Sequence, residues 1–274
     1  MARRSSFVSW LVQYVLDKRE VALSEPVARP SATDRGNVRN PYSVLPNWLY
    51  PAFVVVALSA FGIFAGWVVF FQHEGYYAPY LSPFYSPLIN VGPIPPGVWV
   101  AWAPLVFRLT CYYYRKAYFR SFFWHPRSCA VPEPKRGRYR GETAFPWVLN
   151  NLHRFAFYAT VVQVAFLWFD AVLAFDFGGR FGVGLGTVLM VANVVLLSGY
   201  TFGCHAFRHL AGGDLDCFSC SLAARARHKL WRGVTVLNVR HDRWAWASLF
   251  SVAATDIYIR LLLAGVLHDP RWVS

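Results

Sequence analysis

Five long apolar runs, separated by polar connections, dominate the pattern of residues along the chain. They cover approximately residues 49–71, 98–114, 147–175, 181–203 and 244–267. Several of these runs reach the ~20 residues that a helix needs to span a hydrocarbon core of ~30 Å. The pattern therefore predicts an all-α integral membrane bundle of five transmembrane helices, in a domain that covers residues 48–274.

The segment before the first run, residues 1–47, has a different pattern. Its apolar stretch, Phe7–Leu16, follows two arginines and is too short to span a membrane, and it lacks the small-residue cleavage site of a secretory signal. We expect a short amphipathic helix that lies on the membrane surface or against a partner. Residues 25–40 are rich in Pro, Ser, Arg and Asp and predict an extended linker.

Composition supports the membrane class, and the placement of charge predicts an orientation. Hydrophobic residues make up 56% of the chain and charged residues only 15%, against about 25% charged residues in soluble domains. The net charge of +13 could indicate nucleic-acid binding. However, the basic residues concentrate in the N-terminal segment and in the second-to-third and fourth-to-fifth connections. By the positive-inside rule this predicts a multi-pass protein of the cytoplasmic membrane with a cytoplasmic N-terminus and no nucleic-acid partner.

Two polar or small-residue features fall within the apolar runs. Gly182, Gly184 and Gly186 begin the fourth run and would let helices approach closely. Asp256 and Arg260 are four residues apart in the fifth run, a spacing that lets them pair on one helix face.

A repeated phrase links two pairs of runs. The second and fourth runs both end in Cys-x-x-x-Arg, and about forty residues later the third and fifth runs begin with Leu-Asn-x-x-His. The cysteines and histidines of these phrases are Cys111, Cys204, His153 and His241. A pseudo-twofold axis through the bundle would bring the two cysteines together, and likewise the two histidines.

This set of side chains predicts a metal centre at the cytoplasmic face. The predicted topology puts all five cysteines on the reducing side of the membrane, so structural disulfides are not expected. Two cysteines and two histidines are the ligand set of a Rieske-type [2Fe–2S] cluster, with both thiolates on one iron and both imidazoles on the other. The same residues are also consistent with ordinary buried packing.

Two other metal arrangements remain open. A haem b could be held between two helices by His153 with His205 or His241. A zinc ion could be held by the spacing His-x3-His followed by Cys-x2-Cys. The residues of this second spacing are His205, His209, Cys217 and Cys220. Cys129, in the second-to-third connection, is interpreted as a plain loop thiol.

Several phrases resemble the membrane subunit of an actinobacterial-type succinate dehydrogenase, a respiratory complex II. The most specific is Leu-Thr-Cys-Tyr-Tyr-Tyr-Arg-Lys-Ala-Tyr at residues 109–118. Others are Ser128-Cys129-Ala130-Val131, Gly141-Glu142-Thr143, His153-Arg154, Cys204-His205, Leu237-Asn238 with His241, Ala245-Trp246-Ala247-Ser248-Leu249 and Thr255-Asp256-Ile257-Tyr258. The resemblance covers most of the chain from about residue 48 onward. The Cys217/Cys220 pair is not part of it, which weakens the zinc hypothesis.

The resemblance implies a five-helix anchor that docks a flavoprotein subunit and an iron–sulfur subunit on its cytoplasmic face. It also implies electron transfer to menaquinone or ubiquinone, with a Rieske-type [2Fe–2S] cluster in place of haem. Nothing in the chain resembles an FAD or dicarboxylate site, so we expect no succinate oxidation by this chain alone. The residues placed to bind quinone are Arg115, His205, Arg208 and His209. For the arginines, positive-inside snorkelling is an equal alternative.

Two further function classes are weighed against this one. A transporter would place polar residues at mid-membrane on discontinuous spans, whereas Asp170 and Asp256 lie near the predicted outer face. A redox-inert structural anchor would use the same five helices without a cofactor.

Overall fold

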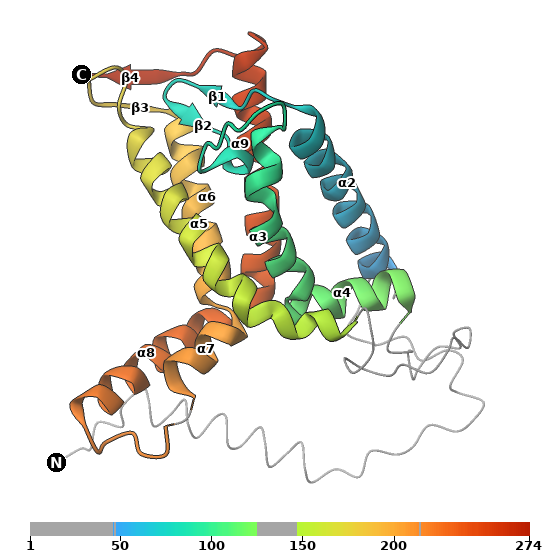
Figure 1. Ribbon diagram of the computed structural model, residues 1–274, viewed down its shortest axis with the longest axis vertical. Helices are drawn as coiled ribbons and strands as arrows, with labels where there is room; N and C mark the ends of the chain where they lie inside the picture. The colour runs from blue at the N-terminus through green and yellow to red at the C-terminus, as the bar shows by residue number, and fades with distance from the viewer. Residues whose placement is uncertain (1–45, 47, 125–146, 214) are drawn as a thin grey trace, which may run out of the picture. The chain divides into compact units, whose positions relative to one another are not determined.

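The computed structural model describes residues 46, 48–124, 147–213 and 215–274 (Figure 1). The predicted amphipathic helix and linker of the N-terminal segment, and Cys129, lie outside these residues. Within the described part, helices form a bundle in which α6 (Leu185–Phe202) packs along α5 (His153–Leu173) and α9 (His241–Leu263), and α3 (Pro96–Thr110) packs along α5 and α2 (Leu49–Phe71). Two small sheets gather at one end of the bundle and α4 (Tyr112–Phe123) lies at the other (Figure 1).

Four helices in the described residues are long and apolar enough to cross a membrane. They are α2 (Leu49–Phe71), α5 (His153–Leu173), α6 (Leu185–Phe202) and α9 (His241–Leu263). Helix α2 coincides with the first predicted span. A 3-10 helix, η3 (Trp147–Leu152), precedes α5, and α9 begins and ends a few residues before the predicted fifth span. Apolar runs therefore located these helices to within a turn or two.

The second apolar run does not form the continuous helix predicted over 98–114. Helix α3 (Pro96–Thr110) ends before Cys111, and α4 (Tyr112–Phe123) begins after it. Helix α3 has 15 residues and is about 22 Å long, which is short of the ~30 Å hydrocarbon core. The backbone of Cys111 is extended, with φ −62° and ψ 129°. Hydropathy alone does not reveal such a break, because the apolar pattern continues across it.

The start of the fourth run is a strand, which corrects the predicted helix over 181–184. Strand β3 (Gly182–Gly184) pairs antiparallel with β4 (Arg271–Val273). A Cβ atom on Gly184 would clash with the Asp269 carboxylate and the Tyr80 hydroxyl, and one on Gly186 would clash with the Tyr80 ring. These glycines therefore make room for Tyr80 and for the loop before β4, and not for another helix as predicted.

The loop between α2 and α3 is also ordered. It contains β1 (Tyr76–Tyr77), which pairs antiparallel with β2 (Tyr80–Leu81), and a 3-10 helix, η2 (Pro83–Tyr85). Burial, followed by a hydrogen bond to Asp269, raises the pKa of Tyr80 to about 12. The fold is thus mostly helical, with two small sheets that the all-α prediction did not include.

The connection between α6 and α9 forms a helical hairpin, α7 (His205–Gly212) and α8 (Leu222–Asn238). Two arginines hold this hairpin together: Arg208, which the sequence predicted to bind quinone, and Arg227, which it assigned only to topology. Arg208 donates from Nε to Thr235 Oγ1 at 3.1 Å and lies over the Trp231 ring. Arg227 donates to the backbone carbonyls of Ala211 and Gly213 at the end of α7.

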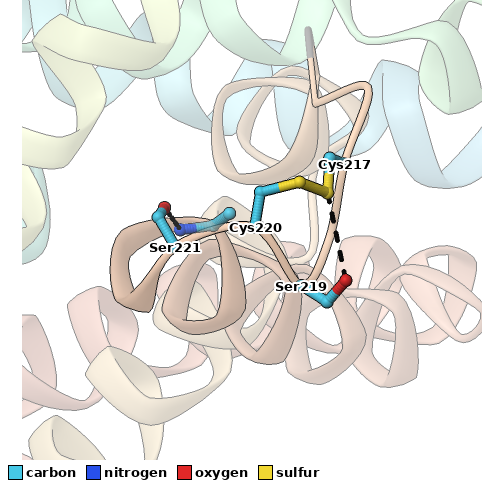
Figure 2. Close-up of a disulfide and its surroundings, with 5 residues drawn as sticks. Cys217, Ser219, Cys220 and Ser221 are labelled. Atoms are coloured by element: carbon cyan, nitrogen blue, oxygen red, sulfur yellow. Dashed lines mark hydrogen bonds between the residues drawn. A yellow bond between two sulfur atoms is a disulfide. The ribbon is translucent and has the colours of Figure 1, made fainter.

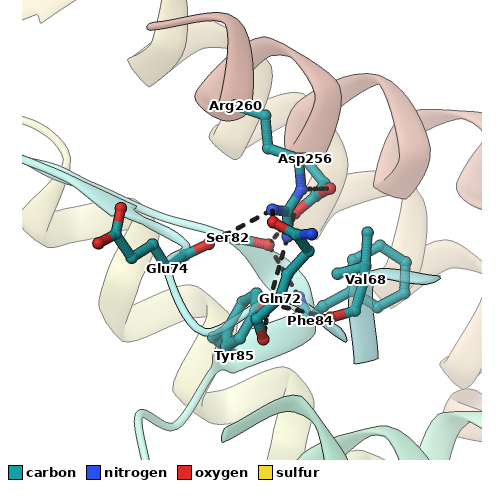
Figure 3. A network of polar contacts seen from close by, with 8 residues as sticks. All are labelled: Val68, Gln72, Glu74, Ser82, Phe84, Tyr85, Asp256 and Arg260. Atoms are coloured by element: carbon teal, nitrogen blue, oxygen red, sulfur yellow. Dashed lines mark hydrogen bonds and ion pairs between the residues drawn. The ribbon is translucent and has the colours of Figure 1, made fainter. Parts of the chain in front are cut away.

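The predicted pairing of Asp256 with Arg260 is confirmed, and it organises the end of the bundle near β1 and β2 (Figure 3). Arg260 Nε donates to Asp256 Oδ2 at 2.7 Å. Ser82 Oγ donates to the other carboxylate oxygen of Asp256. Arg260 also donates to Tyr85 Oη, whose hydroxyl donates to the carbonyl of Gln72 at the end of α2. The ion pair therefore ties α9 to the loop that follows α2.

Candidate metal centre

Both cysteines of the repeated phrase stand at a break between two helices. Cys111 separates α3 from α4, and Cys204 separates α6 from α7. The two backbones have nearly the same conformation, with φ −62° and ψ 129° at Cys111 and φ −68° and ψ 147° at Cys204. Each cysteine is the N-cap of the following helix, and their exposed fractions are 2% and 0%. Both belong to the same buried core cluster.

The two histidines begin the helices that return through the bundle. His153 is the first residue of α5 and His241 is the first residue of α9. His153 Nε2 lies 2.9 Å from Cys204 Sγ, and His241 Nε2 lies 3.5 Å from Cys111 Sγ. Each thiol therefore contacts an imidazole of the other hairpin. The structure brings all four predicted residues to one buried place at the end of the bundle where α4 and α7 begin.

An aromatic ring supports each imidazole. Phe107 stacks on His153, with ring centroids 4.7 Å apart and an interplanar angle of 4°. Tyr200 stacks on His241, with centroids 4.9 Å apart and an angle of 16°. Both rings stand four residues before a cysteine, one turn earlier on α3 and α6. The sequence interpretation missed these two residues, although their equal spacing from the two cysteines was a usable signal.

A threonine fixes the tautomer of one histidine. Thr110 Oγ1 donates its proton to the carbonyl of Val106 at 2.6 Å, and it lies 2.9 Å from His153 Nδ1. Because the hydroxyl proton is already used, His153 must donate from Nδ1, which leaves the Nε2 lone pair directed at Cys204. An imidazole whose other nitrogen donates to a fixed acceptor is the usual form of a metal-ligating histidine. Thr110 was not among the predicted site residues.

The chemistry of these four side chains fits a thiolate- and imidazole-bound iron cluster in kind and in number. Burial is the main cause that raises the pKa of the Cys204 thiol to about 12, so a thiolate there needs a positive partner, which a metal ion supplies. Among the described residues, no group of three or more His, Cys, Asp or Glu side chains is arranged to hold one metal ion. What is present is two Cys–His contacts, whereas a Rieske-type cluster takes both thiolates on one iron and both imidazoles on the other.

The pair Cys217 and Cys220 does not offer thiolates, which corrects two sequence expectations. The two residues form a disulfide in the turn before α8, with Cα atoms 5.8 Å apart (Figure 2). Next to it, Ser221 accepts a hydrogen bond from the Ala224 N–H and caps α8. The expectation of no disulfide rested on the compartment, whereas a tight turn brings these cysteines within bonding range. The zinc site of His205, His209, Cys217 and Cys220 therefore loses two of its four ligands.

Three of the four residues predicted to bind quinone lie on α7 and the fourth, Arg115, lies on α4. The side chain of Arg208 is engaged with α8, as described above. His205 and His209 are exposed on α7, and His209 Nδ1 lies 3.5 Å from Arg154 Nη2 of α5. Arg115 lies over the Tyr112 ring on α4. All four are near the cysteine breaks along the chain, but they face different neighbours.

Comparisons with known proteins agree with this architecture. The family model described as actinobacterial succinate dehydrogenase subunit SdhC matches residues 49–265. The chain is similar to one chain of a solved structure, the Mycobacterium smegmatis Sdh1 complex in the apo form, with 37% sequence identity and a TM-score of 0.76. The match covers 89% of this chain and 96% of that one. A comparison with curated proteins found no match. With its long apolar helices, the chain is a multi-pass membrane protein that belongs to the family of actinobacterial succinate dehydrogenase subunit SdhC.

Proposed function

We propose that this chain anchors the flavoprotein and iron–sulfur subunits of a succinate dehydrogenase to the cytoplasmic membrane. We further propose that it passes electrons to membrane quinone through a Rieske-type [2Fe–2S] cluster. The ligands in this proposal are Cys111, Cys204, His153 and His241. The observation that carries it is the meeting of two buried thiols and two imidazoles at matched helix starts.

The proposed topology keeps five spans with the N-terminus in the cytoplasm. Helix α3 would cross the membrane together with the residues that flank it, since its 15 residues alone are shorter than the core. Helices α4, α7 and α8 carry many arginines and lysines and would then face the cytoplasm. This puts the proposed ligands on the side where the soluble subunits of the complex would dock.

The residues of this chain would orient the proposed cluster ligands and keep water away from them. A Rieske-type cluster supplies one-electron transfer when it is bound. Thr110 holds His153 in the tautomer with a free Nε2, and the stacked rings of Phe107 and Tyr200 fix the planes of the two imidazoles. The backbone N–H of Ala206 donates to Cys204 Sγ at 3.4 Å, a contact that favours a thiolate. Arg115, His205, Arg208 and His209 remain the proposed quinone-binding residues from the sequence.

The ligand proposal is tested by replacing His153 and His241 together by Ala in the purified complex. We expect the EPR signal of the reduced Rieske centre to disappear. Quinone reduction should fall by more than about 100-fold, beyond the 10- to 100-fold effect of residues that only support a ligand. Succinate oxidation with an artificial acceptor should persist.

His268→Ala, which changes an exposed histidine after α9, is the matched control and should leave both activities and the signal intact. A Rieske signal that survives in the double variant would overturn the ligand set. A sharp haem absorption band in the wild-type complex would favour the bis-histidine haem alternative. A complex without either signal would be a redox-inert anchor.

A further inference from the structure

Helix α8 has three faces, and one of them packs against α7 and the end of α6. This face consists of residues at helical spacing: Ala224, Arg227, Trp231, Val234 and Asn238. Ala224 and Val234 are buried. Asn238 Nδ2 donates to the carbonyl of Gly203 at 2.8 Å, and Arg227 donates to the end of α7 as described above. The other two faces of α8 are largely exposed.

The second face is an apolar stripe that borders a groove. Its residues follow one another at intervals of four, four, three and four: Leu222, Ala226, Leu230, Gly233 and Leu237. Leu222 and Leu230 are 79% and 49% exposed. All of the stripe except Leu222 lines an open apolar groove, together with Phe202 of α6 and Phe207 of α7.

The groove lies where a membrane-crossing helix ends. Phe202 is the last residue of α6, and α6 is one of the helices long and apolar enough to cross a membrane. Helices α7 and α8 extend sideways from this end of the bundle (Figure 1). The end of an apolar span lies close to the boundary between the hydrocarbon core and the lipid headgroups. The groove is therefore at the depth where an acyl chain meets its headgroup.

The third face of α8 is basic, and it consists of Arg225, Lys229 and Arg232. All three residues are exposed, and none of their side chains makes a hydrogen bond or an ion pair with the residues that the structure describes. They differ in this respect from Arg208 and Arg227, which hold the hairpin together. Lys229 also lines the groove, so the basic face and the apolar groove share an edge.

Charge and shape together select an anionic phospholipid as the occupant. No acidic residue lies between Cys217 and His241, so nothing on α8 neutralises its basic side chains. Clusters of Lys and Arg on an amphipathic helix at a membrane attract anionic lipid headgroups, and such a helix lies in the plane of the interface. An acidic soluble partner would match the charge, but it would leave the apolar groove beside α6 unfilled.

We propose that α8 lies in the membrane interface and binds an anionic phospholipid, with an acyl chain in the groove and the phosphate against Arg225, Lys229 and Arg232. The proposal goes beyond the proposed function, because it needs only the membrane class of the chain and neither the cluster nor quinone. Its place in the fold gives the lipid a role. Helix α7 begins directly after Cys204 and α8 ends three residues before His241, so the lipid would hold the hairpin that joins two residues of the candidate metal centre.

The test uses the assembled complex in lipid nanodiscs that contain a small fraction of a photoreactive phospholipid. The two probes are phosphatidylglycerol and phosphatidylcholine with the same diazirine-bearing acyl chain, and the labelled peptides are mapped by mass spectrometry. In the wild type we expect phosphatidylglycerol to label α8 at least fivefold more than phosphatidylcholine does. Salt should reduce this preference, since it screens exposed charges. The label on α2, where Ile63 is 75% exposed, is the internal reference and should show no preference.

Two variants separate the headgroup from the acyl chain. The triple variant Arg225→Gln, Lys229→Gln and Arg232→Gln should bring the labelling ratio of the two probes close to one. Gly233→Leu fills the groove, and a Cβ atom at Gly233 would meet nothing within 4 Å, so the helix can accept the larger side chain. We expect this variant to lower the α8 label at least fivefold with both probes.

The matched control is the double variant Arg180→Gln with Arg271→Gln, which removes two exposed arginines next to β3 and on β4. It should leave the labelling of α8 unchanged, and all variants should keep the melting temperature of the wild type. Equal labelling of α8 by the two probes in the wild type, or no label there, would overturn the proposal. So would release of a soluble subunit from the triple variant with an unchanged labelling ratio, which would assign the basic face to protein docking. Because labelling needs no cofactor and no turnover, these outcomes are independent of the cluster proposal.

Discussion

The two helical hairpins that meet at the candidate metal centre agree in their backbones and differ in their supports. The first consists of α3, α4 and α5, and the second of α6, α7 and α9. In both, the cysteine N–H donates to the carbonyl three residues earlier at 3.3 Å, and the cysteine carbonyl accepts from the arginine four residues later. In both, a ring one turn before the cysteine stacks on the histidine of the same hairpin.

The supports around this shared frame are not repeated. The residue before the cysteine is Thr110 in the first hairpin, where it binds His153 Nδ1, and Gly203 in the second. His241 Nδ1 is buried and has no hydrogen-bond partner among the residues that the structure describes. The residue three positions before the cysteine is Arg108 in the first hairpin and Thr201 in the second. The comparison shows that the helix ends place the four side chains in the same way in both hairpins. The polar contacts that orient these side chains differ between the two hairpins.

The largest expected effect tests whether the two hairpins contribute equally. Cys111→Ser and Cys204→Ser should each remove the Rieske EPR signal and the iron that this cluster adds to the complex, because each variant deletes one thiolate of a proposed four-ligand set. Quinone reduction should fall by more than about 100-fold in both, beyond the range of supporting residues. The double variant Cys217→Ser with Cys220→Ser, outside the candidate centre, should retain full iron content. If only one of the two single variants lost iron, the proposed symmetry of the ligand set would be wrong.

The next largest effect concerns stability and an arginine that is present in the first hairpin and not in the second. Arg108 donates to Ser248 Oγ and to Tyr114 Oη, and its guanidinium lies 4.7 Å from the centroid of the Tyr200 ring. Arg108→Leu should lower the free energy of unfolding by about 3 kcal/mol, since hydrogen bonds to a charged group contribute roughly 1.5–3 kcal/mol each. Thermal unfolding of the complex in detergent measures this loss. A melting temperature equal to that of the wild type would show that Arg108 does not brace α3 against α9.

A smaller effect is expected from Thr110→Val, which keeps the shape of the side chain and removes its hydroxyl. His153 then loses the acceptor at Nδ1 that fixes its tautomer. Residues in such a supporting role typically change metal affinity or activity by 10- to 100-fold, and we expect the lower end, with a shifted reduction potential in a redox titration. If the reduction potential and the iron content did not change, His153, like His241, would not need a hydrogen bond at Nδ1.

The smallest effect is expected at the position of the second hairpin that corresponds to Arg108. Thr201 is fully buried, and its Oγ1 atom lacks a hydrogen-bond partner within the described residues. Thr201→Val replaces an unpaired hydroxyl by a methyl group of similar shape. It should change the free energy of unfolding by less than about 0.5 kcal/mol or stabilise the protein slightly. A clear loss of stability or of the EPR signal would reveal a partner for this hydroxyl in the assembled complex.

Much of the site was predictable because its residues lie in two sequence phrases that each occur twice in the chain. The phrases Cys-x-x-x-Arg and Leu-Asn-x-x-His identified four residues that the structure brings together, since repeated phrases at equal spacing start equivalent helices. Thr110 was not predictable in the same way, because it has no counterpart in the second hairpin. The disulfide of Cys217 and Cys220 was excluded on compartment grounds, although its three-residue spacing was compatible with a turn.

The sequence by itself determined the membrane class, the approximate positions of the long apolar helices and the local pairing of Asp256 with Arg260. Each of these depends on composition or on neighbours within one helix, and both are read directly from the order of residues. Only the tertiary structure decided that each thiol meets the imidazole of the other hairpin, that Gly184 and Gly186 make room for Tyr80, and that α8 forms an apolar groove with the end of α6. Those features depend on how elements far apart in the chain pack against one another, and no local pattern of residues encodes that packing.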